Sequence, residues 1–293
     1  MKDIQGIITP LVTPFDAQGE LDEAKFRAEV EVLIAAEVDG LSPGGSTGEG
    51  AALTDEELVR LIRIIREVKH DALIVAGVIR NSTKAAVSAC LAAKKAGADC
   101  LMVTPVSYNV LVPNDDGNFD YYSAIARESG LPVIIYNVVP QNIISPALLT
   151  RLSGVPGILG VKQSCGGIAA FYDVKRRCGE VAKVFSATDE MLFSTFELGA
   201  DGAISAILTA FPELCIRMWK ASKAGDTKLG YEIQERLYPV WQAIAGSQFP
   251  IRLKYAMKLM GREPGFTRSP IVNIPEEGKE GIRLALKAAG FIG

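Results

Sequence analysis

The 293-residue chain carries 31 Lys and Arg against 34 Asp and Glu, which gives a formal net charge of −3, and 48% of its residues are hydrophobic. This length suits one large α/β domain or two ordinary ones. The slightly negative charge offers no general attraction to nucleic acid or to an anionic membrane, so we expect neither as a partner.

Cysteine and histidine usage narrows the chemistry further. The five cysteines are scattered without a CxxC pair, which favours reduced thiols in a cytoplasmic protein over disulfides or a zinc site. The N-terminal residues lack the layout of a signal peptide, and no apolar run approaches membrane-spanning length. His70 is the only histidine, so a His-rich metal site is excluded and we expect no bound metal.

Up to about residue 205, short apolar runs alternate with amphipathic helical patterns. The runs predict strands at residues 7–11, 40–42, 73–77, 100–104, 133–136, 158–162, 184–186 and 202–205. The patterns between them predict helices at residues 21–37, 54–69, 82–96, 118–129, 145–152, 168–177 and 189–198. This regular series of strand–helix units favours a closed parallel (β/α)8 TIM barrel over an open sheet.

A short repeat supports the barrel. Asp39, Asp99 and Asp201 each stand at a polar corner between a helical pattern and the next strand, often with a glycine suited to a left-handed helix cap. The repeat indicates one supersecondary unit that is used several times.

Beyond residue 205 the alternation gives way to helical patterns at 208–223, 226–245, 250–260 and 276–289. We therefore expect residues 1–205 to form the barrel, with its last helix at about 208–223. Residues 224–293 should form a C-terminal helical extension packed on it. Trp219 and Trp241 lie in the tail, where core packing is their simplest role.

Lys162 is unusual because it ends an apolar strand instead of lying in a charged helix. The run 158–161 before it is bounded by Pro156-Gly157 and Gly166-Gly167, the pattern of a strand buried on both faces. Burying an ammonium is costly unless it is paired, and burial favours the neutral amine. A neutral lysine can attack a carbonyl carbon, as Schiff-base catalysis requires. The alternative is a side chain that leaves the sheet and reaches water.

The active site of a (β/α)8 barrel lies at the C-terminal ends of its strands. There the glycine-rich loop around Ser46 and Thr47 suits a carboxylate or a phosphate, or is simply a tight turn. Tyr136, at another strand end, acts as a general acid and base or caps the barrel. Asp189 and Glu190 follow the seventh strand, where they bind substrate hydroxyls or are ordinary acidic residues of a first helical turn.

Together, the loop GGSTGE at 44–49, Tyr136-Asn137, Lys162 and GADGAIS at 199–205 resemble the dihydrodipicolinate synthase / N-acetylneuraminate lyase family over nearly the whole chain. The resemblance implies a TIM barrel with a C-terminal helical part. It also implies a class I lyase or aldolase that holds pyruvate or another 2-oxo acid as a lysine Schiff base. Such an enzyme needs no cofactor and is typically a homotetramer, a dimer of dimers.

The resemblance assigns roles to individual catalytic residues. Lys162 would form the Schiff base, and Tyr136 would relay protons. Ser46 and Thr47, with the loop amides that include Gly45, would hold the carboxylate of the 2-oxo acid.

Three further positions match less central parts of the family pattern. Tyr108 resembles a tyrosine that some members extend across a subunit interface to complete the relay, although its segment is one residue longer here. Ala187 and Ile204 match positions that line the pocket, largely through backbone groups.

One stretch departs from the pattern. Dihydrodipicolinate synthases usually place an arginine shortly after the Tyr-Asn pair, where it binds the carboxylate of the aldehyde substrate, but here VVPQN follows Asn137. An amide binds a carboxylate more weakly than a guanidinium does. Together with Asp189 and Glu190, this favours a hydroxylated, sugar-acid-like substrate. Cleavage, condensation and dehydration all remain open.

Three alternatives accompany this hypothesis. The first is 4-hydroxy-tetrahydrodipicolinate synthesis from pyruvate and aspartate semialdehyde. The second is a non-catalytic protein that binds a 2-oxo acid as a sensor, although simple binding needs neither Lys162 nor Tyr136. The third, more distant, is a phosphate-binding barrel that uses the loop 44–50.

Overall fold

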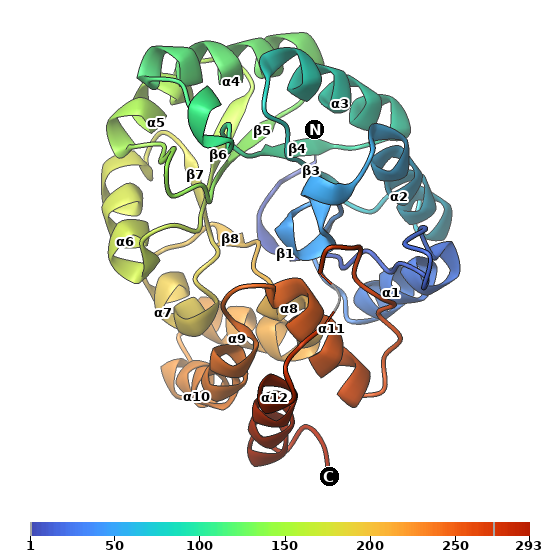
Figure 1. The fold of residues 1–293 in the computed structure, drawn as a ribbon. Coiled ribbons are helices and arrows are strands. Elements are labelled where there is room, and N and C mark those ends of the chain that lie inside the picture. Colours follow the sequence, from blue (N-terminus) through green and yellow to red (C-terminus); the bar gives the residue numbers. More distant parts are fainter. Residues whose placement is uncertain (1, 272) are drawn as a thin grey trace.

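The computed structural model describes residues 2–271 and 273–293, and this part of the chain contains a barrel of parallel strands surrounded by helices (Figure 1). The strands pair in the order β2-β1-β8-β7-β6-β5-β4-β3, and the single bridge between Leu41 and Ile74 brings β2 beside β3. The predicted TIM barrel is confirmed. The strands are β1 (Gly6–Pro10), β2 (Gly40–Ser42), β3 (Val75–Val78), β4 (Cys100–Val103), β5 (Val133–Asn137), β6 (Ile158–Gln163), β7 (Lys183–Ser186) and β8 (Gly202–Ala203).

The helices between the strands lie close to their predicted positions. Helix α4 begins earlier than predicted because the Asn114 side chain accepts a hydrogen bond from the Gly117 amide at 2.9 Å, an N-cap. The predicted helix 189–198 starts as a 3-10 turn at Asp189–Met191. These helices are α1 (Glu23–Ala35), α2 (Asp55–Val68), α3 (Thr83–Ala96), α4 (Asp115–Ser129), α5 (Pro146–Ser153), α6 (Gly167–Cys178) and α7 (Leu192–Glu197).

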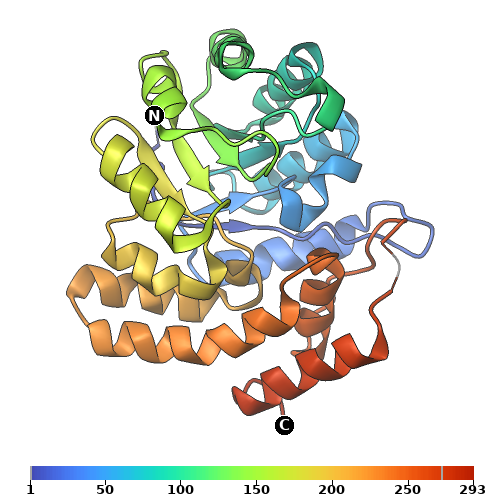
Figure 2. The same cartoon turned by 60° about the vertical axis from the view of Figure 1, so that its left-hand side comes forward.

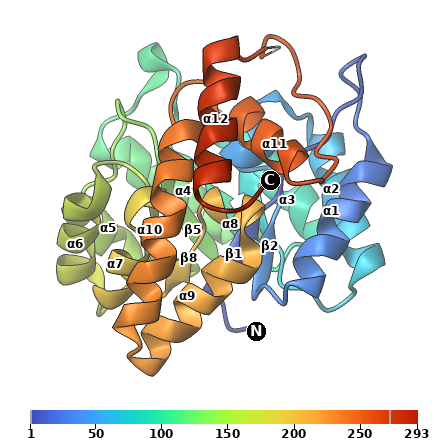
Figure 3. The ribbon, with the colours of Figure 1, turned by 90° about the horizontal axis from the view of Figure 1, so that it is seen from below.

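The C-terminal helices gather on one side of the barrel, as the orange and red segments of Figure 2 and Figure 3 show. The prediction of a single helix at 208–223 is wrong, because the chain breaks at Phe211 into two helices. Pro212 lacks an amide hydrogen and disfavours helical geometry in the residue before it. No described helix is long and apolar enough to cross a membrane. The helices are α8 (Ile207–Ala210), α9 (Pro212–Ala224), α10 (Thr227–Ile244), α11 (Phe249–Leu259) and α12 (Glu276–Ala288).

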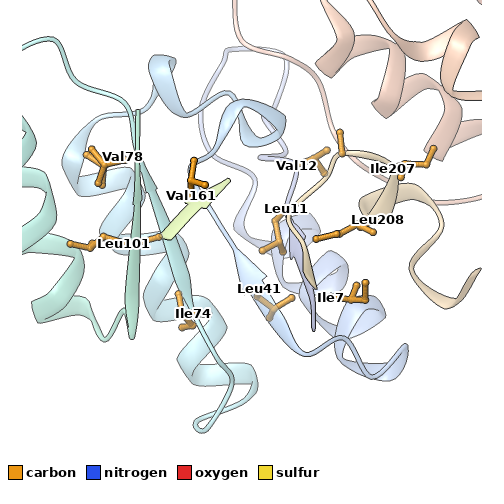
Figure 4. Packing of buried hydrophobic residues seen from close by; sticks show 14 of the residues in the cluster. Ile7, Leu11, Val12, Leu41, Ile74, Val78, Leu101, Val161, Ile207 and Leu208 are labelled. Carbon is orange, nitrogen blue, oxygen red and sulfur yellow. The ribbon is translucent and has the colours of Figure 1, made fainter. Parts of the chain in front are cut away.

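Successive strand residues point to opposite faces, and this alternation divides the core into two layers. Ile7 and Leu101 belong to the layer between strands and helices, part of which Figure 4 shows, whereas Ile8 and Met102 belong to a second cluster inside the barrel. Tyr136 belongs to the inner cluster. The alternation therefore turns the Tyr136 side chain into the barrel.

The repeated aspartates join neighbouring strands at their N-terminal ends. Asp99 accepts a hydrogen bond from the Ile74 amide at 2.9 Å and returns one from its own amide to the Ile74 carbonyl, also at 2.9 Å. Asp39 does the same with Ile7, and Asp201 with Val184. The repeated aspartates therefore provide hydrogen-bond partners for backbone groups at the N-terminal end of the barrel.

Candidate active site

Lys162 and Tyr136 meet inside the barrel because β5 and β6 pair in a register that puts them opposite each other. The Lys162 Nζ lies 3.8 Å from the centroid of the Tyr136 ring, and the two residues are 4% and 5% exposed. Within the described residues the amine has no hydrogen-bonded or ion-paired partner, and it lines a small cavity. The predicted buried lysine is therefore present, and its amine is open to a ligand in the cavity.

The turn after β2 brings the hydroxyl groups to this pair. Ser46 begins a 3-10 turn, and the Tyr136 hydroxyl donates a hydrogen bond to Ser46 Oγ at 3.1 Å. Thr47 is buried and lines the cavity. A Cβ on Gly50 would lie only 1.8 Å from the Gly44 carbonyl oxygen, so the tight turn requires glycine for steric reasons as well.

The cavity has a volume of about 150 Å³, the space of roughly five water molecules, which suits a small acid. Ala187 and Ile204 line it, as the family resemblance implied. Gly45 is buried beside Met102 and does not line it. The cavity thus unites Lys162, Tyr136, Thr47, Ala187, Asp189 and Ile204 from five segments of the chain.

Asp189 is both a helix cap and a wall of the cavity. Its Oδ1 accepts a hydrogen bond at 2.7 Å from the amide of Ile207, the first residue of α8. Protein atoms enclose the carboxyl except where it faces the cavity, and this burial raises its pKa to about 6, against the opposing effects of the Ser205 hydroxyl, the Ile207 amide and the Lys162 charge. Glu190 is half-buried and lies outside the cavity wall.

Tyr108 lies apart from these residues within one chain. It lies in the loop after β4 and is 60% exposed. Its backbone amide donates to Asn81 Oδ1 at 3.1 Å. The role across a subunit interface stays a prediction.

The cavity also includes residues that the sequence analysis did not assign to it. Ser164 and Ser205 line it with buried hydroxyls; that of Ser164 has no hydrogen-bond partner within the described residues, and that of Ser205 lies beside the Asp189 carboxyl. Both follow strands closely, a position that could have identified them. Trp241 and Phe249 close the outer side from the C-terminal helices, so Trp241 is more than a core aromatic.

A second, larger cavity of about 810 Å³ lies between the turn at 16–20 and the segments around α11 and 264–269. It contains none of the residues predicted for the site. Of the three lysines that line it, Lys254 is bonded to carboxylate and carbonyl groups, Lys279 is bonded to Glu276, and Lys258 is exposed. We therefore place the chemistry in the small cavity, where a free amine, a phenol and hydroxyls converge.

Comparisons with known proteins agree with this geometry. The chain is 35% identical over 292 residues to 4-hydroxy-tetrahydrodipicolinate synthase of Chelativorans sp., covering 98% of this chain and 99% of the relative. It is 33% identical over 293 residues to the enzyme of the same name from Bartonella bacilliformis, covering 99% of each.

Solved structures show the same architecture. Dihydrodipicolinate synthase from Aquifex aeolicus matches with a TM-score of 0.91 at 28% identity, over 98% of this chain and 99% of that chain. The enzyme from Acinetobacter baumannii, solved with pyruvate, matches with a TM-score of 0.92 at 30% identity, over 99% of this chain and 100% of that chain. The model of the dihydrodipicolinate synthetase family matches residues 3–289, and this chain belongs to that family.

Proposed function

We propose that this protein forms an imine between Lys162 and pyruvate or a related 2-oxo acid, and makes or breaks a carbon–carbon bond next to it. The observation that carries the proposal is the buried Lys162 amine, free of protein partners and 3.8 Å from the Tyr136 ring centroid. Family membership supports a class I lyase or aldolase. No metal or organic cofactor is needed, because the imine itself withdraws electrons.

The reaction follows from the positions of these groups. The turn at Ser46 and Thr47 receives the substrate carboxylate. The Lys162 amine attacks the C2 carbonyl carbon, and loss of water leaves a protonated imine. Loss of a proton from C3 gives an enamine, which attacks the carbonyl carbon of an aldehyde; cleavage is the reverse. Tyr136, hydrogen-bonded to Ser46, moves these protons.

We propose 4-hydroxy-tetrahydrodipicolinate synthesis, from pyruvate and aspartate semialdehyde, as the first activity to test. The matched relatives carry the name of that enzyme, which supports this alternative better than the sugar-acid substrate favoured by the sequence.

One observation keeps a hydroxylated, sugar-acid-like substrate as the second candidate. The described cavity wall contains Val138 and Asp189 but no arginine. Asp189 repels a second substrate carboxylate when it is ionised, whereas it accepts hydrogen bonds from hydroxyl groups. The unpartnered hydroxyl of Ser164 suits the same kind of substrate.

The deciding experiment is imine trapping with sodium borohydride, with the modified peptide located by mass spectrometry and Lys162→Ala as the control. Pyruvate should add to Lys162, and turnover of aspartate semialdehyde or of 2-keto-3-deoxy sugar acids then separates the two candidates. An adduct without any turnover favours the 2-oxo acid sensor. No adduct with pyruvate or with the sugar acids rules out the imine mechanism.

We also propose that the enzyme is a cytoplasmic homotetramer in which Tyr108 reaches a neighbouring active site. The support is the family resemblance and the exposed position of this side chain. Mixing inactive Tyr108→Phe and Lys162→Ala subunits tests it. Exchange across an interface should restore a fraction of the activity, and tyrosines that act within their own subunit should not.

A further inference from the structure

Glu49 ends the turn that carries Ser46 and Thr47, and its conformation is unusual. Its backbone adopts φ +56° and ψ +34°, the left-handed region that residues other than glycine seldom occupy. It thereby joins the 3-10 turns Ser46–Gly48 and Gly50–Ala52. The carboxylate does not line the small cavity but turns away from it toward the C-terminal part.

Both carboxylate oxygens of Glu49 accept hydrogen bonds from the C-terminal part of the chain. Lys254, in α11, donates from Nζ to Oε1 at 2.7 Å, and the side chains of this pair are 4% and 3% exposed, Glu49 first. The backbone amide of Arg268 donates to Oε2 at 2.9 Å. Glu49 is thus anchored at two points that lie more than 200 residues away in sequence.

Lys254 fixes the same turn by a second route. Its Nζ also donates to the carbonyl oxygens of Thr13 and Phe266, both at 2.6 Å, so its three donors are all used. The Thr13 hydroxyl in turn donates to the Gly48 carbonyl at 2.6 Å. Burial lowers the pKa of Lys254, and the Glu49 charge opposes that effect.

We propose that Glu49 and Lys254 are positioning residues through which the C-terminal helices hold Ser46 and Thr47 in place to receive the substrate carboxylate. A buried ion pair adds little net stability over apolar packing, but separating its charges is very unfavourable, so it strongly prefers one geometry. The turn is therefore held in a single position relative to Lys162. This inference rests on the proposed imine chemistry.

The test compares pyruvate with acetone, a ketone that lacks the carboxylate. Borohydride trapping at Lys162 is measured for Glu49→Gln and for the double variant Glu49→Gln/Lys254→Met, which leaves no unpaired charge if the single variant folds poorly. Pyruvate trapping should slow about 10- to 100-fold, the effect expected of a displacement near 1 Å. Acetone trapping should stay close to that of the unmodified chain.

Arg262→Met is the matched control. Arg262 forms a largely buried ion pair with Glu29 of α1, and donates to the Thr209 carbonyl at 2.6 Å, without touching the turn. It should lower stability while it leaves the ratio of pyruvate to acetone trapping unchanged.

Two outcomes separate this inference from the function on which it rests. If pyruvate and acetone trapping fall by the same factor in the Glu49 variants, the positioning role is overturned. If the unmodified chain traps neither these ketones nor the 2-keto-3-deoxy sugar acids, the proposed function fails, and the positioning role is then tested by hydrogen exchange of the amides at 44–52 alone. Faster exchange in the variants supports it, and unchanged exchange overturns it.

Discussion

Two lysines in this protein are buried to nearly the same extent but have opposite surroundings. Lys162 is 4% exposed and Lys254 is 3% exposed. Lys254 donates to a carboxylate and two carbonyl groups, whereas the Lys162 amine faces the Tyr136 ring and a cavity. Burial alone therefore does not mark a reactive lysine. The distinguishing feature is an amine whose donors are left for a ligand.

The physical reason lies in what each site offers to a positive charge. Glu49 pairs with Lys254 at 2.7 Å, and with two carbonyl groups it engages all three donors of that amine, which leaves no side open to a substrate. The nearest partner of Lys162 is an aromatic face, which compensates a charge only partly. The Lys162 amine is therefore open to a substrate carbonyl carbon in the cavity, which is the contact that a nucleophile needs.

The most direct test of the difference between the two lysines is to remove each amine in turn. Lys162→Met should lower turnover by on the order of 10⁴-fold or more, because no other described group in the cavity can form the imine. Steady-state kinetics with the substrate found by screening measures this. Retention of even a tenth of the activity would contradict the assignment.

The same substitution at the paired lysine should act on stability. Lys254→Met leaves the Glu49 carboxylate buried without its partner, which costs about 3–5 kcal/mol of the free energy of unfolding. Lys162→Met should change it by less than about 1 kcal/mol, because the amine has no protein hydrogen bond to lose. Urea unfolding of both variants gives the two values. Equal losses of the free energy of unfolding would mean that the two lysines do not differ in how the protein pairs them.

Tyr136→Phe probes the ring and the hydroxyl separately. The ring that faces Lys162 is kept, but the hydrogen bond to Ser46 at 3.1 Å and the proton relay are lost. Turnover should fall about 100-fold or more, while borohydride still traps the pyruvate imine. Loss of trapping together with turnover would instead give the hydroxyl a role in forming the imine.

Asp189 tests whether the buried groups of the candidate site lower the stability of the folded protein. Its pKa is raised by burial from 3.8 to about 6. The folded protein therefore holds a proton between pH 4 and 6 that the unfolded chain releases, so stability falls as pH rises through this window and stays lower above it. Asp189→Asn should raise the free energy of unfolding by about 3 kcal/mol at pH 8 and by much less at pH 4. A pH-independent change would refute the explanation.

The sequence predicted the part of the site that depends on local pattern. Strand periodicity and the rule that barrel sites lie at strand ends identified Lys162, Tyr136 and the turn at Ser46. The break between α8 and α9 was not predicted, although Pro212 inside the predicted helix is a local signal for it.

The remaining features depend on packing between distant segments. Trp241 and Phe249 reach the cavity only because the C-terminal helices fold back over the barrel mouth. The partnership of Glu49 and Lys254 spans 205 positions, and neither residue stands in a local pattern that indicates the other. Sequence periodicity reports which face of an element is buried, but not which distant residue covers it.

The ion pair between Glu49 and Lys254 also bears on how this protein could be recombined with its relatives. Dividing the sequence near residue 205 separates the barrel strands from the C-terminal helices. The two charged residues then lie in different fragments. A chimera joined there inherits its acid from one parent and its base from the other. Segment exchange therefore requires parents that match at both positions, and the natural unit of exchange is the whole chain.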